Sequence, residues 1–227
     1  MSGLKQFQMS SARPLPIIVL ADVSGSMGVD GKIEALNAAL KEMINTFSTE
    51  SRLRAEIQVS LITFGGTQAA THLQLTPAHE APKIEPLIAS GGTPMGSALE
   101  AVREILENKE LISSRAYRPV LVLVSDGLPT DDWSQSFLRL QDSERAKKAT
   151  RLAMAIGADA DEEMLQSFIQ DVEAPLFKAH NARDIHRFFR AVTMSVTTKS
   201  RSPNPDQSAA FVIDDLPNED PMNGLEY

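Results

Sequence analysis

Residues 15–26 read LPIIVLADVSGS, in which a seven-residue apolar run leads directly into the D-V-S-G-S of residues 22–26. A near-continuous apolar run is typical of a strand that is covered on both faces, as in a parallel sheet. This strand is expected to end by presenting one carboxylate and two hydroxyls at alternate positions. Such hard oxygen donors suit Mg²⁺ or Mn²⁺ better than a soft metal. Alone, the pattern is a weak signal, because Asp and Ser also fill ordinary turns.

Two later segments strengthen the metal hypothesis. The glycine-rich stretch GGTPMG at residues 91–96 offers the hydroxyl of Thr93 just before a helical pattern. The apolar run VLVLV at residues 120–124 is followed by Ser125 and the carboxylate of Asp126. In an open parallel sheet, ligands collect at the carboxyl ends of the strands. One metal site is therefore expected from five residues: Asp22, Ser24, Ser26, Thr93 and Asp126.

The rest of the chain alternates strand patterns with helical ones. Strands are predicted at residues 15–21, 55–64, 120–124, 152–156 and 175–178, with a short antiparallel edge strand at 71–75. Helices are predicted from Lys32, over 95–111, in one or two pieces over 134–149, over 161–169, and through the apolar residues between Ile185 and Val196. This order predicts an α/β fold with a doubly wound, mostly parallel sheet.

Together the three donor segments resemble the metal-ion-dependent adhesion site of von Willebrand factor type A (VWA) domains, over roughly residues 13–197. All five positions of the family's pattern are matched. The strings GKIEALN at 31–37 and SDGLPTDDW at 125–133 are similar to a bacterial subgroup associated with tellurite-resistance and stress-response operons. The resemblance implies a Rossmann-like VWA fold. It also implies Mg²⁺ as the ion, with Mn²⁺ or Ca²⁺ as alternatives.

The resemblance further implies roles for the five residues. Ser24 and Ser26 would bind the ion directly, and Thr93 directly or through water. Asp22 and Asp126 would supply charge and orient hydroxyls or waters from behind. Because hydroxyls carry no charge, the ion would stay electrophilic and accept a carboxylate from an acidic residue of a protein partner.

The function implied is a non-enzymatic, intracellular protein-binding module of a bacterial stress or tellurite-resistance system, with a Ser/Thr kinase or a PP2C-type phosphatase as partner. One alternative is a Mg²⁺-dependent phosphohydrolase with Asp22 as nucleophile, for which Lys32 is the nearest phosphate-binding candidate. The other is a subunit of a chelatase-type ATPase assembly.

The composition of the chain limits which kinds of partner and which cellular location are expected. A net charge of −8 and a pI near 5.1 argue against a nucleic-acid surface. No apolar run approaches the ~20 residues that span a membrane. The chain has no cysteine, and residues 1–11 lack the apolar core of a signal peptide, so a cytoplasmic location is expected.

Domain boundaries are predicted from changes in composition. Residues 1–13 are expected to be a flexible leader and 14–198 the VWA domain. Residues 199–227 are expected to be an acidic, proline-containing tail, disordered or docking to a partner. Its apolar cluster at 211–213 precedes Asp214 and Asp215, which suggests self-association in which either acid reaches the metal of the same or a neighbouring molecule.

A few polar and aromatic residues near the motifs have structural explanations. Asp131, Asp132 and Trp133 are expected to cap and seat the following helix, with the rim of the site as an alternative for Trp133. Met27 fits either the core or the rim. The histidines lack metal-ligand spacing and are expected to be structural or exposed: His72, His79, His180 and His186.

Overall fold

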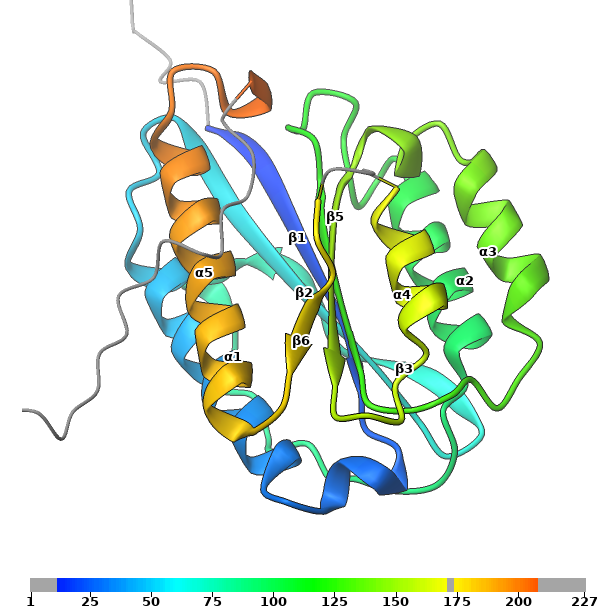
Figure 1. Ribbon diagram of the computed structural model, residues 1–227. Coiled ribbons are helices and arrows are strands. Elements are labelled where there is room, and N and C mark those ends of the chain that lie inside the picture. Colours follow the sequence, from blue (N-terminus) through cyan, green and yellow to red (C-terminus); the bar gives the residue numbers. More distant parts are fainter. Residues whose placement is uncertain (1–11, 171–173, 208–227) are drawn as a thin grey trace, which may run out of the picture.

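A six-stranded sheet forms the centre of the computed structural model, which describes residues 12–170 and 174–207 (Figure 1). The strand order is β3-β2-β1-β4-β5-β6. β3 runs antiparallel to β2, and every other neighbouring pair is parallel. The strands are β1 (Arg13–Asp22), β2 (Ala55–Gly65), β3 (Gln68–Pro77), β4 (Val120–Ser125), β5 (Thr150–Ile156) and β6 (Phe177–Ala179). The predicted fold class is confirmed.

Helices cover both faces of this sheet. They are α1 (Lys32–Thr49), α2 (Met95–Glu107), α3 (Trp133–Asp142), α4 (Glu162–Ile169) and α5 (Ala182–Arg201). α1 and α5 lie on one face, and α2, α3 and α4 on the other (Figure 1). Alternate residues of β1 serve the two layers: Ile17 and Val19 pack in the core with α1 and α5, and Ile18 and Leu20 in the core with the other helices. This two-sided burial explains why β1 has no polar residue between Pro14 and Asp22.

The ends of several elements differ from the prediction. β3 extends beyond residues 71–75, because backbone pairing with β2 continues to the turn at Gly65 whatever the side chains are. The helix predicted over 95–111 ends at Glu107, where the Asn108 side chain accepts hydrogen bonds from the backbone of Glu110 and Leu111. The 134–149 segment forms two helical pieces, α3 and a short 3₁₀ turn at Ala146–Lys148.

The C-terminal part of the described chain is tied to the body. α5 runs to Arg201, whose guanidinium pairs with Glu50 at 2.7 and 2.9 Å. Asp206 accepts a hydrogen bond from the backbone N–H of Arg118 at 2.8 Å. The apolar cluster at 211–213, Asp214 and Asp215 lie outside the described residues, as does most of the predicted leader. The domain boundaries therefore stay a prediction.

Within residues 12–170 and 174–207, none of the helices combines the length and the apolar character needed to cross a bilayer.

Candidate metal centre

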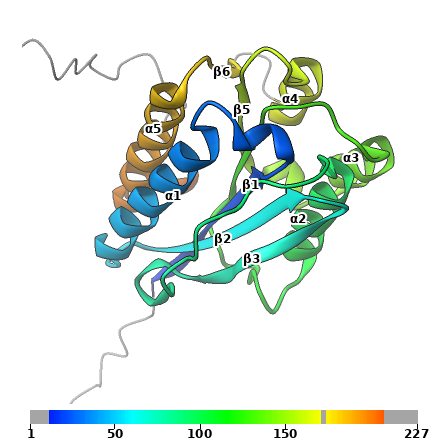
Figure 2. The same cartoon turned by 90° about the horizontal axis from the view of Figure 1, so that it is seen from below.

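The candidate site lies where β1 and β4 end side by side. These neighbouring strands are parallel, so Asp22 and Ser125 reach the same edge of the sheet. From β1 the chain turns to β2 on one side, and it later reaches β4 on the other side of β1. Figure 2 looks onto this edge, with the blue 3₁₀ turn η1 (Gly25–Gly28) in front. Such a change of direction leaves a crevice at the strand ends, where α/β proteins bind ligands.

Asp22 is fully buried and organises the turn that follows it. One carboxylate oxygen, Oδ1, accepts a hydrogen bond from the backbone N–H of Ser24 at 2.8 Å. The other, Oδ2, accepts from the Ser125 hydroxyl at 2.6 Å. Burial raises the pKa of the Asp22 carboxyl above its ordinary value, and the hydrogen bonds from Ser125 and Ser24 oppose that rise. Asp22 therefore holds the loops after β1 and β4 together from behind the site.

The two serines and Asp126 form a compact oxygen cluster in front of Asp22. The hydroxyls of Ser24 and Ser26 are 3.0 Å apart. Ser26 Oγ donates to Asp126 Oδ1 at 2.7 Å, and Ser24 Oγ makes a longer contact of 3.5 Å with the same atom. Ser24 and Asp126 are buried, whereas Ser26 is exposed. The cluster thus opens to solvent through Ser26.

Thr93 reaches the same cluster from the loop before α2. It is buried, and its backbone exchanges two 2.9 Å hydrogen bonds with Thr130, from Thr93 N to Thr130 Oγ1 and from Thr130 N to Thr93 O. A Cβ atom built on Gly127 would lie 3.6 Å from Thr93 Oγ1 and 3.8 Å from Ser26 Oγ. Both hydroxyls therefore face the backbone of Gly127. The structure brings together all five residues that the sequence motifs selected.

Backbone hydrogen bonds join the loops that carry these side chains. Gly25 N donates to Gly91 O at 2.9 Å, and Ser90 N donates to Val23 O at 2.8 Å. On the other side, Gly66 N donates to Ser90 O at 2.9 Å. The loop at 90–92 is thus held between the ends of β1 and β2. Only glycine fits at Gly91, because a Cβ there would lie 2.4 Å from Gly66 Cα.

The acidic pair after β4 caps two helices rather than one. Asp132 accepts a hydrogen bond from Ser134 N at 3.3 Å and caps α3, as predicted. The prediction for Asp131 was wrong: its carboxylate accepts from Gly96 N at 2.8 Å and Ser97 N at 2.9 Å, at the start of α2. The loop from β4 folds back over α2, and this contact cannot be read from local sequence.

Two nearby hydrophobic residues support the core. Trp133 packs edge-on against Phe137 with ring centres 5.4 Å apart, which fits its expected role in seating α3. Met27 is fully buried in the core beneath α1, so core filling is confirmed over a place at the rim.

Lys32 is the residue of the site that the metal hypothesis missed. It begins α1, and its ammonium donates to Asp126 Oδ2 at 2.8 Å, with a longer contact of 3.5 Å to Ser26 O. The Lys32 side chain is 18 % exposed and that of Asp126 is fully buried. Its place only six residues after Ser26 was the one available signal. The Lys32 ammonium therefore forms an ion pair with a carboxylate of the candidate metal centre.

The donor set fits a hard divalent cation. Three hydroxyls and two carboxylates supply only oxygen. Among the described residues, no group of three or more His, Cys, Asp or Glu side chains could hold a metal. A site at this edge would therefore depend on the hydroxyls of Ser24, Ser26 and Thr93, with Asp126 beside them and Asp22 behind.

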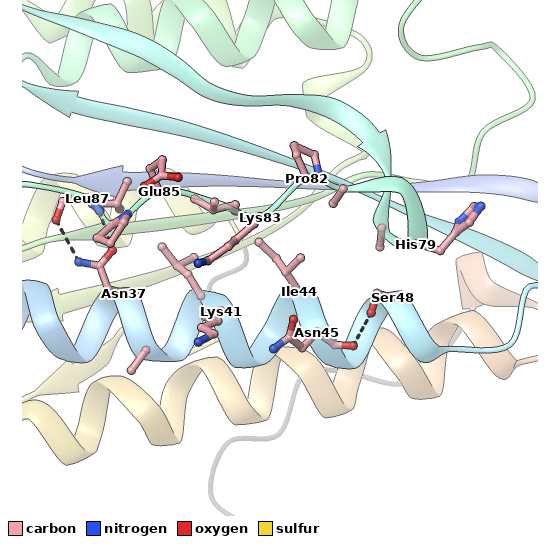
Figure 3. Close-up of a pocket in the computed structure, with 16 residues that line it drawn as sticks. Asn37, Lys41, Ile44, Asn45, Ser48, His79, Pro82, Lys83, Glu85 and Leu87 are labelled. Carbon is pink, nitrogen blue, oxygen red and sulfur yellow. Dashed lines mark hydrogen bonds between the residues drawn. The ribbon is translucent and has the colours of Figure 1, made fainter.

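A separate groove of about 590 Å³ lies between α1 and the extended segment 81–87 (Figure 3). The side chain of Asn37 closes one end, with Nδ2 donating to Leu87 O at 3.0 Å and Oδ1 accepting from Leu87 N at 2.8 Å. Ile44 lines it from α1, and Lys41 and Lys83 add charge (Figure 3). None of the five predicted site residues lines this groove.

Comparison with known proteins supports a VWA domain. The family model described as "von Willebrand factor type A domain" matches residues 17–128, just under half of the chain. This match spans Asp22 to Asp126 and so includes every donor segment. No curated protein matches the chain.

Solved structures share the fold at low sequence identity. A von Willebrand factor type A protein from Catenulispora acidiphila is 19% identical with a TM-score of 0.63, over 82% of this chain and 43% of that one. The ArnB paralog VWA2 from Sulfolobus acidocaldarius is 15% identical with a TM-score of 0.57, over 85% and 47%. Proximal thread matrix protein 1 from the mussel byssus, solved with a zinc-occupied MIDAS motif, is 18% identical with a TM-score of 0.62, over 81% and 48%.

These similarities establish the fold. The chain spans less than half the length of each of these three proteins.

Proposed function

We propose that this protein is a non-enzymatic, metal-dependent protein-binding module, in which an acidic side chain of a partner completes the coordination of a divalent cation. The observation that carries the proposal is the convergence of Ser24, Ser26 and Asp126 at the open end of the β1–β4 crevice. Thr93 joins them from a loop that is hydrogen-bonded to the end of β1.

The chemistry of the donors supports this kind of binding. Ser24, Ser26 and Thr93 would hold the ion through neutral hydroxyls, and Asp126 would compensate part of its charge. When bound, such an ion supplies an electrophilic centre for a carboxylate ligand. Exposure of Ser26 leaves the direction of approach open to another protein. Mg²⁺ is the ion we propose, and the zinc of the mussel structure makes zinc the second ion to test.

The proposal extends to the cellular system in which the protein works and to its partners there. The strings at 31–37 and 125–133 support a bacterial, cytoplasmic stress or tellurite-resistance system with a Ser/Thr kinase or a PP2C-type phosphatase as partner. In a chelatase-type assembly the captured partner would instead be an ATPase.

The geometry disfavours the phosphohydrolase alternative. A nucleophilic aspartate needs a free oxygen that faces the substrate. Both oxygens of Asp22 accept hydrogen bonds from the protein, and the residue is fully buried. Lys32 does lie at the site, but it pairs with Asp126.

The test is capture of partners from a bacterial lysate by the full chain, in Mg²⁺ and in EDTA. We expect a partner that is retained only in Mg²⁺, and lost when Ser24 and Ser26 are both changed to Ala. The control is Ser51→Ala, at an exposed serine after α1. Capture that persists in saturating EDTA would show that no metal bridges the two proteins.

A further inference from the structure

Two cations would share one carboxylate at this site. The ammonium of Lys32 lies 2.8 Å from Asp126 Oδ2, while Ser26 donates to Oδ1 of the same side chain at 2.7 Å. An ion held by Ser24 and Ser26 would therefore lie close to a carboxylate whose charge Lys32 already compensates. Within the described residues Lys32 forms an ion pair with Asp126 alone.

Lys32 is held at this place by the fold. It is the first residue of α1, directly after Gly31, which adopts a left-handed conformation with φ 70°. Gly157, just after β5, lies beside the ammonium: a Cβ there would be 3.8 Å from Lys32 Nζ, an ordinary van der Waals distance. The start of α1 thus places the ammonium at the site, 2.8 Å from Asp126 Oδ2.

We propose that Lys32 sets the affinity of this site for divalent cations, by keeping a fixed positive charge on Asp126 that any bound ion must overcome. This inference rests on the function proposed above. Like charges a few ångströms apart repel even through water, and more strongly where water is partly excluded. The lysine therefore restricts the site to conditions in which the divalent ion is abundant.

The test compares Mn²⁺ and Mg²⁺ binding to the full chain by calorimetry for the natural sequence and Lys32→Met, which keeps most of the length of the side chain but removes its charge. We expect Lys32→Met to bind Mn²⁺ about tenfold more tightly, or more. Lys32→Arg, which keeps the charge, should bind as weakly as the natural protein. Lys41→Met is the matched control, because Lys41 lies on the exposed side of the same helix.

Thermal unfolding gives an independent readout. In EDTA, Lys32→Met should unfold at a lower temperature, because Asp126 stays buried without its cation. In Mn²⁺ the same variant should gain more in melting temperature than the natural protein. Unchanged or weaker Mn²⁺ binding by Lys32→Met, with binding by the natural protein intact, would overturn this inference and leave the proposed function standing. If neither the natural protein nor any variant bound Mn²⁺ or Mg²⁺, both this inference and the proposed function would be wrong.

Discussion

Arg151, on β5 beside the edge strand β6, carries a charge that the described structure only partly compensates. It is 3 % exposed on β5, and its Nε and Nη2 atoms have no hydrogen-bond partner there. Nη1 donates to Phe168 O at 3.4 Å, and the guanidinium lies 5.5 Å from the Phe168 ring centre. Burial lowers the pKa of Arg151 to about 10. Since the folded state lowers this pKa below the unfolded value, the charge destabilises the fold at neutral pH, and this cost is relieved only as the pH rises through about 10.

Changing Arg151 to Met should therefore raise the free energy of unfolding at pH 7 by about 1–3 kcal/mol. Methionine fills similar space without a charge to desolvate. Urea unfolding followed by circular dichroism measures the change, with Arg52→Met as the control at an exposed arginine. A loss of stability would mean that the guanidinium has an acidic partner that outweighs its desolvation.

At the residue scale, the motifs could place the five oxygen donors together, because each donor directly follows a buried strand or precedes a helix. The pairing of Lys32 with Asp126 and the capping of α2 by Asp131 were beyond local reasoning. Their partners, Asp126 and the first turn of α2, are set by how α1 and the loop after β4 pack in three dimensions. Whether the donors hold a metal stays a prediction.

Among the elements, the loops at the crevice depend on a close approach between Gly66 and Gly91. Gly91 has φ 68°, and a Cβ atom there would collide with the backbone of Gly66. We expect Gly91→Ala to lower the free energy of unfolding by about 1–3 kcal/mol or more. It should also weaken Mn²⁺ binding, because the shifted loop carries Thr93.

Comparison of Gly91→Ala with Gly31→Ala by urea unfolding separates the cost of the positive φ from the cost of the collision with Gly66. Gly31 has nearly the same φ, 70°, but a Cβ atom added there would have no neighbour within 4 Å. It should therefore show only the backbone cost, about 1–2 kcal/mol. Equal losses for the two variants would contradict a role for the close approach.

The existence of the strands and their positions along the chain could be predicted, because β1, β4 and β5 each contain a nearly continuous apolar run. Their order in the sheet was not predicted. Their ends were less accessible. The length of β3 follows from backbone pairing with β2, although most of its side chains are not buried. α2 ends where Asn108 redirects the chain, and this short-range contact competes with a continuing helical pattern.

For the whole molecule, a ligand that binds only the folded state must stabilise it. At a Mn²⁺ concentration 100 times the dissociation constant, the expected gain is about 2.7 kcal/mol. For a chain of this size, this gain corresponds to a rise in melting temperature of roughly 5–10 °C. The rise should grow with the logarithm of the Mn²⁺ concentration and be absent when Ser24 and Ser26 are both Ala. The same ionic strength supplied as NaCl is the control, and an equal rise in NaCl would contradict specific binding.

The separation of Ser26 and Asp126 along the chain has a consequence for how the protein folds. Ser26 and Asp126 are 100 residues apart in sequence and meet only because β4 inserts beside β1. Long-range pairing of this kind forms late and slowly. During refolding, the helical signal should therefore return before manganese is bound. Ion uptake would then report when β4 pairs with β1.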